Sequence, residues 1–256
     1  MKKKPMIYAV TNQKGGIGKT TTATCMTSIL SDMGKRVLLI DTDVQCNSTD
    51  LFRAVIDGEA TLYDLLLDDD PCTVMEAIQH TEYGDIIASD FKIQGADWKL
   101  TKKEDFLRLR KALSGIQGYD YIVVDTNPSV NSMLYNALAA ADEVIIPVTA
   151  GRFAITGLSH LTETIMRVKR TLNPDLEIAG LLMVAYRSNA NLYKDLREEL
   201  RTVAPSIGTK LFDSCIRDSV KVGESQVERV PLIKYAKRSN PEKDYEAFVR
   251  ELLAGE

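Results

Sequence analysis

Short apolar runs alternate with longer amphipathic stretches along most of the chain. The apolar, β-branched runs predict strands at residues 6–12, 36–41, 85–89, 119–125, 143–149, 176–185 and 210–212. Apolar residues at helical spacing predict helices at residues 19–33, 100–116, 132–141, 154–172, 190–203 and 241–253. Several strands are apolar at nearly every position, which is typical of parallel sheets covered by helices on both faces. The order therefore predicts an α/β fold with a doubly wound, mostly parallel sheet.

The alternation runs through all 256 residues with no long linker, low-complexity tract or internal repeat. We therefore expect a single domain over residues 1–256. One acidic stretch, residues 57–70, interrupts the pattern with six Asp or Glu residues and no basic residue. We expect a surface loop with a short helix there, and no chemistry.

Composition excludes several classes of protein. With 45% apolar and 27% charged residues, the chain is too apolar for intrinsic disorder. No apolar run approaches the roughly 20 residues that span a bilayer. The four cysteines form no C-x-x-C pair, and there are only two histidines, so we expect neither a zinc nor an iron–sulfur site. These features predict a cytoplasmic protein with reduced thiols.

A glycine-rich segment lies between the first expected strand and the first expected helix. Such a loop lets backbone N–H groups surround a phosphate, while the helix N-terminus adds partial positive charge. Lys19 can reach the terminal phosphates of a nucleotide, and the Thr20 hydroxyl can bind Mg²⁺. The usual pattern has glycine where Gln13 stands, so this is a variant phosphate loop. The expected ATP-binding residues of the loop are Gly15, Gly16, Ile17, Gly18, Lys19, Thr20 and Thr21.

Three carboxylates follow the expected strands nearest the loop. Asp41 and Asp43 are two residues apart, so strand geometry points both side chains to the same face. Asp125 ends another apolar strand, where a carboxylate can hold Mg²⁺ through water. Three carboxylates in this order around one phosphate loop predict a magnesium site, which Thr20 and Asp125 can hold.

A second lysine, Lys14, begins the loop and marks the deviant Walker A class. The chain resembles the ParA/Soj-type partition ATPases, P-loop proteins related to MinD. The resemblance rests on four segments in order: residues 14–22 (KGGIGKTTT), 38–47 (LLIDTDVQCN), 119–129 (YDYIVVDTNPS) and 153–158 (FAITGL). Val44 and Asn127 stand where that family usually has proline, which loosens the backbone of two loops near the nucleotide.

The resemblance implies an ATPase that dimerises on binding ATP and hydrolyses it slowly with Mg²⁺. Lys14, Lys19 and Asp43 are then the catalytic residues: Asp43 positions the attacking water, while Asp41 supports the metal site. Lys14 reaches across the homodimer to the partner's phosphates, which a point charge on a long flexible stem can do. The alternative is that Lys14 stays beside the nucleotide of its own chain.

The resemblance also implies nonspecific binding to double-stranded DNA and a ParB/Spo0J-like partner that stimulates hydrolysis, so that plasmid or chromosome copies are partitioned. Residues 187–238 carry 11 Lys or Arg against 7 Asp or Glu, whereas the whole chain has a net charge of −4. We expect Arg187, Arg217 and Lys221 to contact DNA phosphates and the ATP-bound protein to associate with the nucleoid. The alternative is that these charged side chains only keep exposed helix surfaces hydrated and bind no ligand. Tyr186 and Arg187 are candidates for contacting the adenine base.

Three rival functions belong to related proteins. A MinD-like ATPase needs a basic amphipathic C-terminal helix, but the last 18 residues hold five acidic and two basic residues, so we expect no membrane binding. An iron–sulfur reductase needs bridging cysteines, and Cys72 and Cys215 do not fit their places. The third rival, an ATPase that positions a protein cargo, is not excluded, and it or a MinD-like ATPase is the alternative function. We also expect no operator-binding domain ahead of the strand at residue 6.

Overall fold

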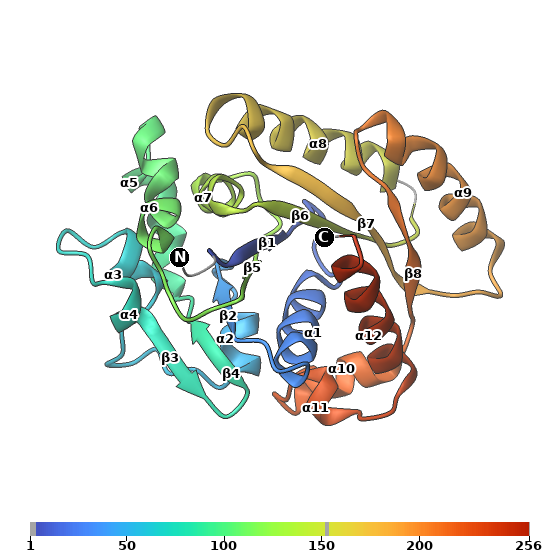
Figure 1. Ribbon diagram of the computed structural model, residues 1–256, viewed down its shortest axis with the longest axis horizontal. Helices are drawn as coiled ribbons and strands as arrows, with labels where there is room; N and C mark the ends of the chain where they lie inside the picture. Colours follow the sequence, from blue (N-terminus) through green and yellow to red (C-terminus); the bar gives the residue numbers. More distant parts are fainter. Residues whose placement is uncertain (1–3, 152–153, 256) are drawn as a thin grey trace.

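The strands form one eight-stranded sheet in the computed structural model, which describes residues 4–151 and 154–255. Across the sheet their order is β3-β4-β2-β5-β1-β6-β7-β8 (Figure 1). Every neighbouring pair is parallel except β3 and β4. The predicted doubly wound, mostly parallel sheet is therefore confirmed. The strands are β1 (Met6–Val10), β2 (Val37–Asp41), β3 (Ile78–Thr81), β4 (Gly84–Ile87), β5 (Tyr121–Asp125), β6 (Glu143–Val148), β7 (Glu177–Tyr186) and β8 (Leu211–Arg217).

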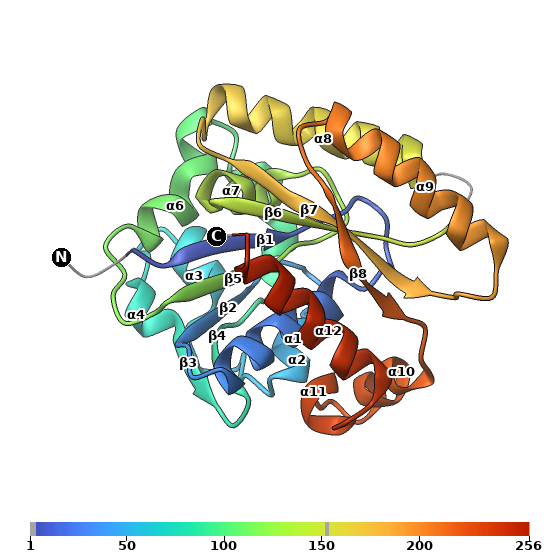
Figure 2. The same ribbon diagram turned by 45° about the vertical axis from the view of Figure 1, so that its right-hand side comes forward.

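Helices cover both faces of the sheet, with α7, α8 and α9 on one face and α1, α11 and α12 on the other (Figures 1 and 2). The α-helices are α1 (Lys19–Asp32), α2 (Asn47–Leu51), α3 (Leu62–Leu66), α4 (Val74–Ala77), α5 (Ala96–Lys99), α6 (Arg108–Leu113), α7 (Ser132–Ala140), α8 (Ala154–Thr171), α9 (Asn191–Ser206), α10 (Val220–Val227), α11 (Leu232–Tyr235) and α12 (Asn240–Leu253). Two 3₁₀ helices, η1 (Phe91–Gly95) and η2 (Lys103–Leu107), lie on either side of α5.

Side chains that alternate along a strand enter two separate apolar cores. In β1, Ile7 and Ala9 pack into the core beneath α7, α8 and α9. Tyr8 and Val10 pack into the opposite core, beneath α1, α11 and α12. Because both sides of the strand are buried, β1 has to be apolar throughout. This burial explains why the central strands were visible in the sequence.

The helix expected at residues 100–116 is wrong. Leu100 instead ends the preceding turn, where its N–H donates to the Ala96 carbonyl. The Asp105 carboxylate accepts the N–H of Thr101 and that of Lys102, which starts a new helical segment at η2. The segment then continues as α6 and ends before Gly115, whose φ of 89° is left-handed. Local side-chain capping thus divides a stretch whose apolar spacing suggested one helix.

Other differences lie at the periphery of the fold. The hydrophobic pattern did not predict β3, a polar strand that pairs antiparallel with β4, nor did it predict α10 and α11. The strand expected at residues 210–212 is longer, because β8 runs to Arg217. Within the acidic stretch, the short helix is α3, which begins with a Thr61–Asp64 capping box.

Parallel strands bring the loops that follow β1, β2, β5, β6, β7 and β8 to one end of the sheet, the carboxyl end. The phosphate-loop segment follows β1 there, and the segments that carry Asp43 and Asn127 follow β2 and β5. Asp41 and Asp125 lie opposite one another in the register of β2 and β5. Residues far apart in the sequence therefore converge at this end, where ligands bind in open α/β sheets.

Replacing Gly180 in β7 by alanine is expected to destabilise the fold by about 2–3 kcal/mol, because the added methyl overpacks the core. A Cβ at this position would lie 2.4 Å from the ring of Phe212, which is buried against Phe248. Urea unfolding measures the change. Gly157→Ala is the matched control: its helical site has no atom within 4 Å of the new Cβ, so stability should hold or rise. Equal stability of the two variants would contradict this packing account.

Candidate functional site

The phosphate loop has the backbone geometry of an anion cradle. Gly16 and Gly18 have φ values of 70° and 79°, a conformation that glycine adopts without strain. A Cβ built on Gly15 or Gly16 would meet no atom within 4 Å, so the space in front of the loop is open. Gly18 immediately precedes α1, whose N-terminal N–H groups face the same space. The residues predicted to bind phosphate are thus arranged to do so.

Lys19 is the buried cation of this loop. Its side chain is 7% exposed, and its ammonium has one hydrogen-bond acceptor among the described residues, the Lys14 carbonyl oxygen at 3.2 Å. Burial lowers the pKa of Lys19, and the nearby charges of Asp125 and Asp43 partly offset this effect. An ammonium has three N–H donors, so the Lys19 ammonium can still donate hydrogen bonds to phosphate oxygens.

Asp41 and Asp125 are fully buried at the ends of β2 and β5. Both oxygens of Asp41 have donors: Oδ1 accepts the Asp43 N–H, and Oδ2 accepts both the N–H and the hydroxyl of Thr49. Asp125 Oδ2 accepts the hydroxyl of Ser48 at 2.8 Å, but Asp125 Oδ1 is buried without a hydrogen-bond partner among the described residues. Burial raises the pKa of both carboxyl groups.

The unpaired oxygen of Asp125 fits the donor set that magnesium uses. The Thr20 hydroxyl is near enough to Asp125 to offset part of the burial that raises the pKa of this carboxyl group, although no hydrogen bond reaches Asp125 Oδ1 among the described residues. A hydroxyl and a carboxylate therefore lie close together. Within residues 4–151 and 154–255, no three His, Cys, Asp or Glu side chains form a metal cage. Magnesium bound to nucleotide needs none, because phosphates and waters supply most of its ligands. Thr20 and Asp125 could therefore hold Mg²⁺ here, while Asp41 holds the segment after β2 by accepting hydrogen bonds from Asp43 and Thr49.

The loop after β2 presents Asp43 to the same space. Asp43 is 6% exposed, and its Oδ1 accepts the N–H of Gln45 at 3.0 Å. Cys46 follows with a left-handed φ of 53° and leads into α2. Burial raises the pKa of the Cys46 thiol to about 11, so this sulfur stays protonated near neutral pH. Asp43 thus has a fixed position beside the loop even though Val44 stands where proline was expected.

A cavity of ≈ 490 Å³ lies over these groups. The sequence predicted Gly15 to Thr21 and Asp43 among its lining residues. It missed the other walls, which come from α2, α10 and the segments that follow β2 and β5. Those further lining residues are Gln45, Asn47, Asp50, Leu51, Pro128, Val222 and Gln226. Tyr186 and Arg187 do not line the cavity: Tyr186 packs on Tyr193, and Arg187 pairs with Asp218. Their contact with adenine stays a prediction.

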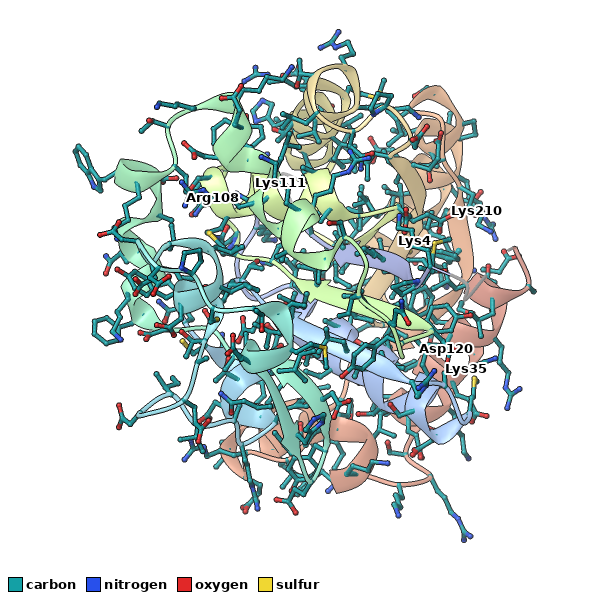
Figure 3. All side chains as sticks on the ribbon, turned by 60° about the vertical axis from the view of Figure 1, so that its left-hand side comes forward. Lys4, Lys35, Arg108, Lys111, Asp120 and Lys210 are labelled. Carbon is teal, nitrogen blue, oxygen red and sulfur yellow. The ribbon has the colours of Figure 1, made fainter. Side chains whose placement is uncertain are left out.

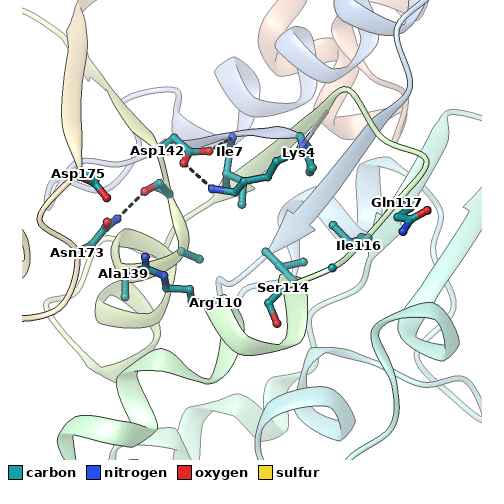
Figure 4. A pocket seen from close by; sticks show the side chains of 15 residues that line it. Lys4, Ile7, Arg110, Ser114, Ile116, Gln117, Ala139, Asp142, Asn173 and Asp175 are labelled. Carbon is teal, nitrogen blue, oxygen red and sulfur yellow. Dashed lines mark hydrogen bonds and ion pairs between the residues drawn. The ribbon is translucent and has the colours of Figure 1, made fainter. Parts of the chain in front are cut away.

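A larger cavity, ≈ 590 Å³, opens at the amino end of the sheet (Figure 4). The Lys4 ammonium there is paired with Asp142 at 2.8 Å, and Asp142 also accepts the N–H of Ile7. The Asn173 amide is engaged by the carbonyls of Leu138 and Ala141. These polar groups already have partners, and no glycine cradle faces the space. Size alone therefore does not make this cavity the nucleotide site.

Lys14 lies outside the cavity that its own loop forms. The residue is exposed, and a Cβ on Gly151, in the loop after β6, would lie 3.2 Å from the Lys14 Nζ. No ion pair of Lys14 occurs among the described residues. Its charge is therefore presented outward at the carboxyl end of the sheet.

Comparison with known proteins decides the family. A family model described as an AAA domain matches residues 5–178. The chain is 37% identical to the sporulation initiation inhibitor protein Soj of Bacillus subtilis, over 97% of this chain and 98% of that protein. It is 36% identical to the chromosome partitioning protein ParA of Caulobacter vibrioides, over 98% and 94%. The chain belongs to the ParA/Soj family of partition ATPases.

Solved structures of similar proteins agree with this assignment. A plasmid partition protein from Borrelia burgdorferi bound to AMPPNP superposes with a TM-score of 0.84 at 26% identity, over 99% of this chain and 100% of that one. Cobyrinic acid a,c-diamide synthase from Mycobacterium smegmatis, with an ATP analogue and magnesium, gives 0.83 at 27% identity, over 97% and 94%. The expected P-loop ATPase fold of the ParA/Soj type is thus confirmed.

The three cations expected to bind DNA each have an acidic partner in this ParA/Soj-family chain. Arg217 donates to Asp244 through its backbone N–H and its guanidinium, which ties β8 to α12. Lys221 pairs with Glu224 at 2.7 Å, and Arg187 pairs with Asp218.

Phe153, the aromatic residue of the fourth motif, lies outside the described residues. No helix in the described part of the chain is long and apolar enough to cross a membrane.

Proposed function

We propose that this chain is a partition ATPase that binds Mg²⁺ and ATP, dimerises in that state, holds nonspecific DNA and hydrolyses ATP slowly. One observation carries the proposal. Among the described residues, the buried Lys19 ammonium has one acceptor and the nearby buried Asp125 Oδ1 has no donor, and both adjoin an open glycine cradle. Phosphates supply the missing acceptors and magnesium the missing positive charge, so a single ligand, Mg²⁺ with ATP, satisfies all three features.

Hydrolysis by water needs positioning and charge stabilisation more than covalent chemistry. Asp43 has a place for orienting the water, since its carboxylate is fixed by the Gln45 N–H and lines the cavity. Lys19 would stabilise negative charge on the transferred phosphoryl group. Thr20 and Asp125 would hold Mg²⁺, which offsets charge on the phosphate oxygens when bound.

Dimerisation through the carboxyl end of the sheet is supported by what that end exposes. Three apolar side chains in segments that follow β5, β7 and β8 are exposed: Val130 is 48% exposed, Leu192 60% and Val220 76%. Contact with another protein surface at this end of the sheet would cover them. Lys14 faces outward among these elements instead of toward its own cavity, so a second copy would bring phosphates to it.

DNA binding is supported by the placement of α10. Val222 and Gln226 of this helix wall the nucleotide cavity, while Lys221 on the same helix is exposed. Binding or hydrolysis of the nucleotide could therefore move α10 and with it Lys221, which would contact DNA phosphates. We further propose that a ParB/Spo0J-like partner stimulates hydrolysis and that DNA holds the ATP-bound dimer at the nucleoid; a relative named as a chromosome partitioning protein supports a role in partition.

An ATPase assay with and without Mg²⁺, DNA and a ParB-like partner tests this function. We expect slow hydrolysis that requires Mg²⁺ and rises when DNA and partner are both present. An ATP affinity that is the same with and without Mg²⁺, or failure to bind ATP, would contradict the proposal.

Replacing Lys221 by alanine should weaken DNA binding by the ATP-loaded dimer equally for all sequences. Removing one cation that neutralises a DNA phosphate lowers the slope of log affinity against log salt by about 0.9. Lys35→Ala is the matched control, since Lys35 follows α1 at the amino end of the sheet, on the face shown in Figure 3. Filter binding across a salt series measures both. An unchanged slope in Lys221→Ala would mean that this cation serves only its pair with Glu224.

Arg217 is expected to behave differently from Lys221, because its guanidinium and N–H both bind Asp244, which is 12% exposed. Arg217→Ala should lower the free energy of unfolding by about 1 kcal/mol as well as any DNA affinity. Thermal unfolding without DNA separates the two effects.

A further inference from the structure

Ser48 connects the loop after β2 to the carboxylate at the end of β5. It is the second residue of α2, and its side chain is fully buried. Its hydroxyl donates to Asp125 Oδ2 at 2.8 Å. Neither the phosphate loop nor the proposed water-positioning group involves this hydroxyl.

The four oxygens of the two buried carboxylates are not equivalent. Both oxygens of Asp41 accept hydrogen bonds from the Asp43 and Thr49 groups described above. Asp125 Oδ2 accepts from Ser48, which leaves Asp125 Oδ1 as the one of the four with no donor in the described part of the chain. Asp125 Oδ1 is therefore the oxygen of this pair that is most available to a cation or to its bound water.

An aspartate carboxylate turns easily about its terminal torsion, because that torsion has broad, roughly two-fold wells. A donor on one oxygen removes this freedom and fixes where the other oxygen points. Removing outer donors of this kind typically changes metal affinity by about 10–100-fold.

We infer that Ser48 is a positioning residue for magnesium: its hydroxyl holds Asp125 Oδ2, so that Oδ1 is directed at the metal's water shell beside Thr20. The inference rests on the proposed binding of Mg²⁺ with ATP. Thr49, the next residue, holds Asp41 in the same way, so the first turn of α2 orients both carboxylates at once. Ser48 touches neither substrate nor metal and acts only through Asp125.

The test is a magnesium titration of ATP-analogue binding, followed by fluorescence, in the full chain. Ser48→Ala should raise the Mg²⁺ concentration for half-maximal binding by about 10-fold. Binding measured in EDTA should not change, because the glycine cradle and Lys19 are intact. Ser28→Ala is the matched control: Ser28 is also buried, in α1, and its hydroxyl has no partner among the described residues. Ser48→Thr keeps a hydroxyl and should restore part of the Mg²⁺ response.

Three outcomes would overturn the inference. The first is an unchanged Mg²⁺ midpoint in Ser48→Ala, and the second is an equal loss of affinity in EDTA, which would mean that Ser48 only shapes the loop. The third is the same midpoint shift in Ser28→Ala. If wild-type binding itself showed no Mg²⁺ dependence, the proposed function would fail and the inference with it, so the two failures are distinguishable. Melting temperatures of all variants show whether each is folded.

Discussion

Alanine in place of Lys19 is expected to reduce ATP affinity by about 10- to 100-fold. The ammonium is buried at the cradle, and a charge-assisted hydrogen bond contributes about 1.5–3 kcal/mol, where each 1.4 kcal/mol is tenfold in affinity. Isothermal titration with an ATP analogue and Mg²⁺ measures the loss.

The same variant should fold at least as stably as wild type without nucleotide. Burial lowers the pKa of Lys19, which means that the empty site holds this charge at a cost. Unfolding of both proteins by urea in the absence of ATP separates an effect on binding from an effect on folding. ATP binding by Lys19→Ala at wild-type affinity would contradict the assignment of the phosphate site.

Replacing Asp43 by alanine is expected to lower the hydrolysis rate by about 100–1,000-fold while ATP affinity stays within a few-fold of wild type. The carboxylate lines the cavity and makes no hydrogen bond to the Lys19 ammonium among the described residues, so its removal should affect the water more than the nucleotide. Single-turnover hydrolysis and titration of the same preparation give both values. Asp57→Ala, in the exposed acidic loop, is the matched control and should hydrolyse normally. Hydrolysis by Asp43→Ala at the wild-type rate would remove Asp43 from its proposed role.

The sequence predicted most of the sheet because its central strands are buried on both faces, as the alternation along β1 shows. It predicted the phosphate loop because glycines at left-handed positions, here Gly16 and Gly18, leave a local signature. Asp41, Asp43 and Asp125 could be placed together because parallel strands end at one side of the sheet.

Features that depend on tertiary contacts could not be predicted. The role of Ser48 becomes visible only when α2 packs against the end of β5. The α10 wall of the cavity lies about 200 residues beyond the loop it faces, and its apolar face is too short to show a period. The break near Leu100 results from side-chain capping by Asp105, which hydrophobic spacing does not report. The ion pair between Arg217 and Asp244 also depends on tertiary packing, so counting charges along the sequence could not show that the charge of Arg217 is already paired.

In the proposed dimer, Mg²⁺ and ATP join two copies through the carboxyl end of the sheet, and Lys14 of each copy faces the other's phosphates. Sedimentation of the Asp43→Ala protein measures this dimerisation, because that variant should keep ATP intact during the run. We expect a dimer with Mg²⁺ and ATP, a monomer with Mg²⁺ and ADP, and a monomer in both nucleotides once Lys14→Ala is added. The same mass with ATP and ADP, or full dimerisation without Lys14, would contradict the claim.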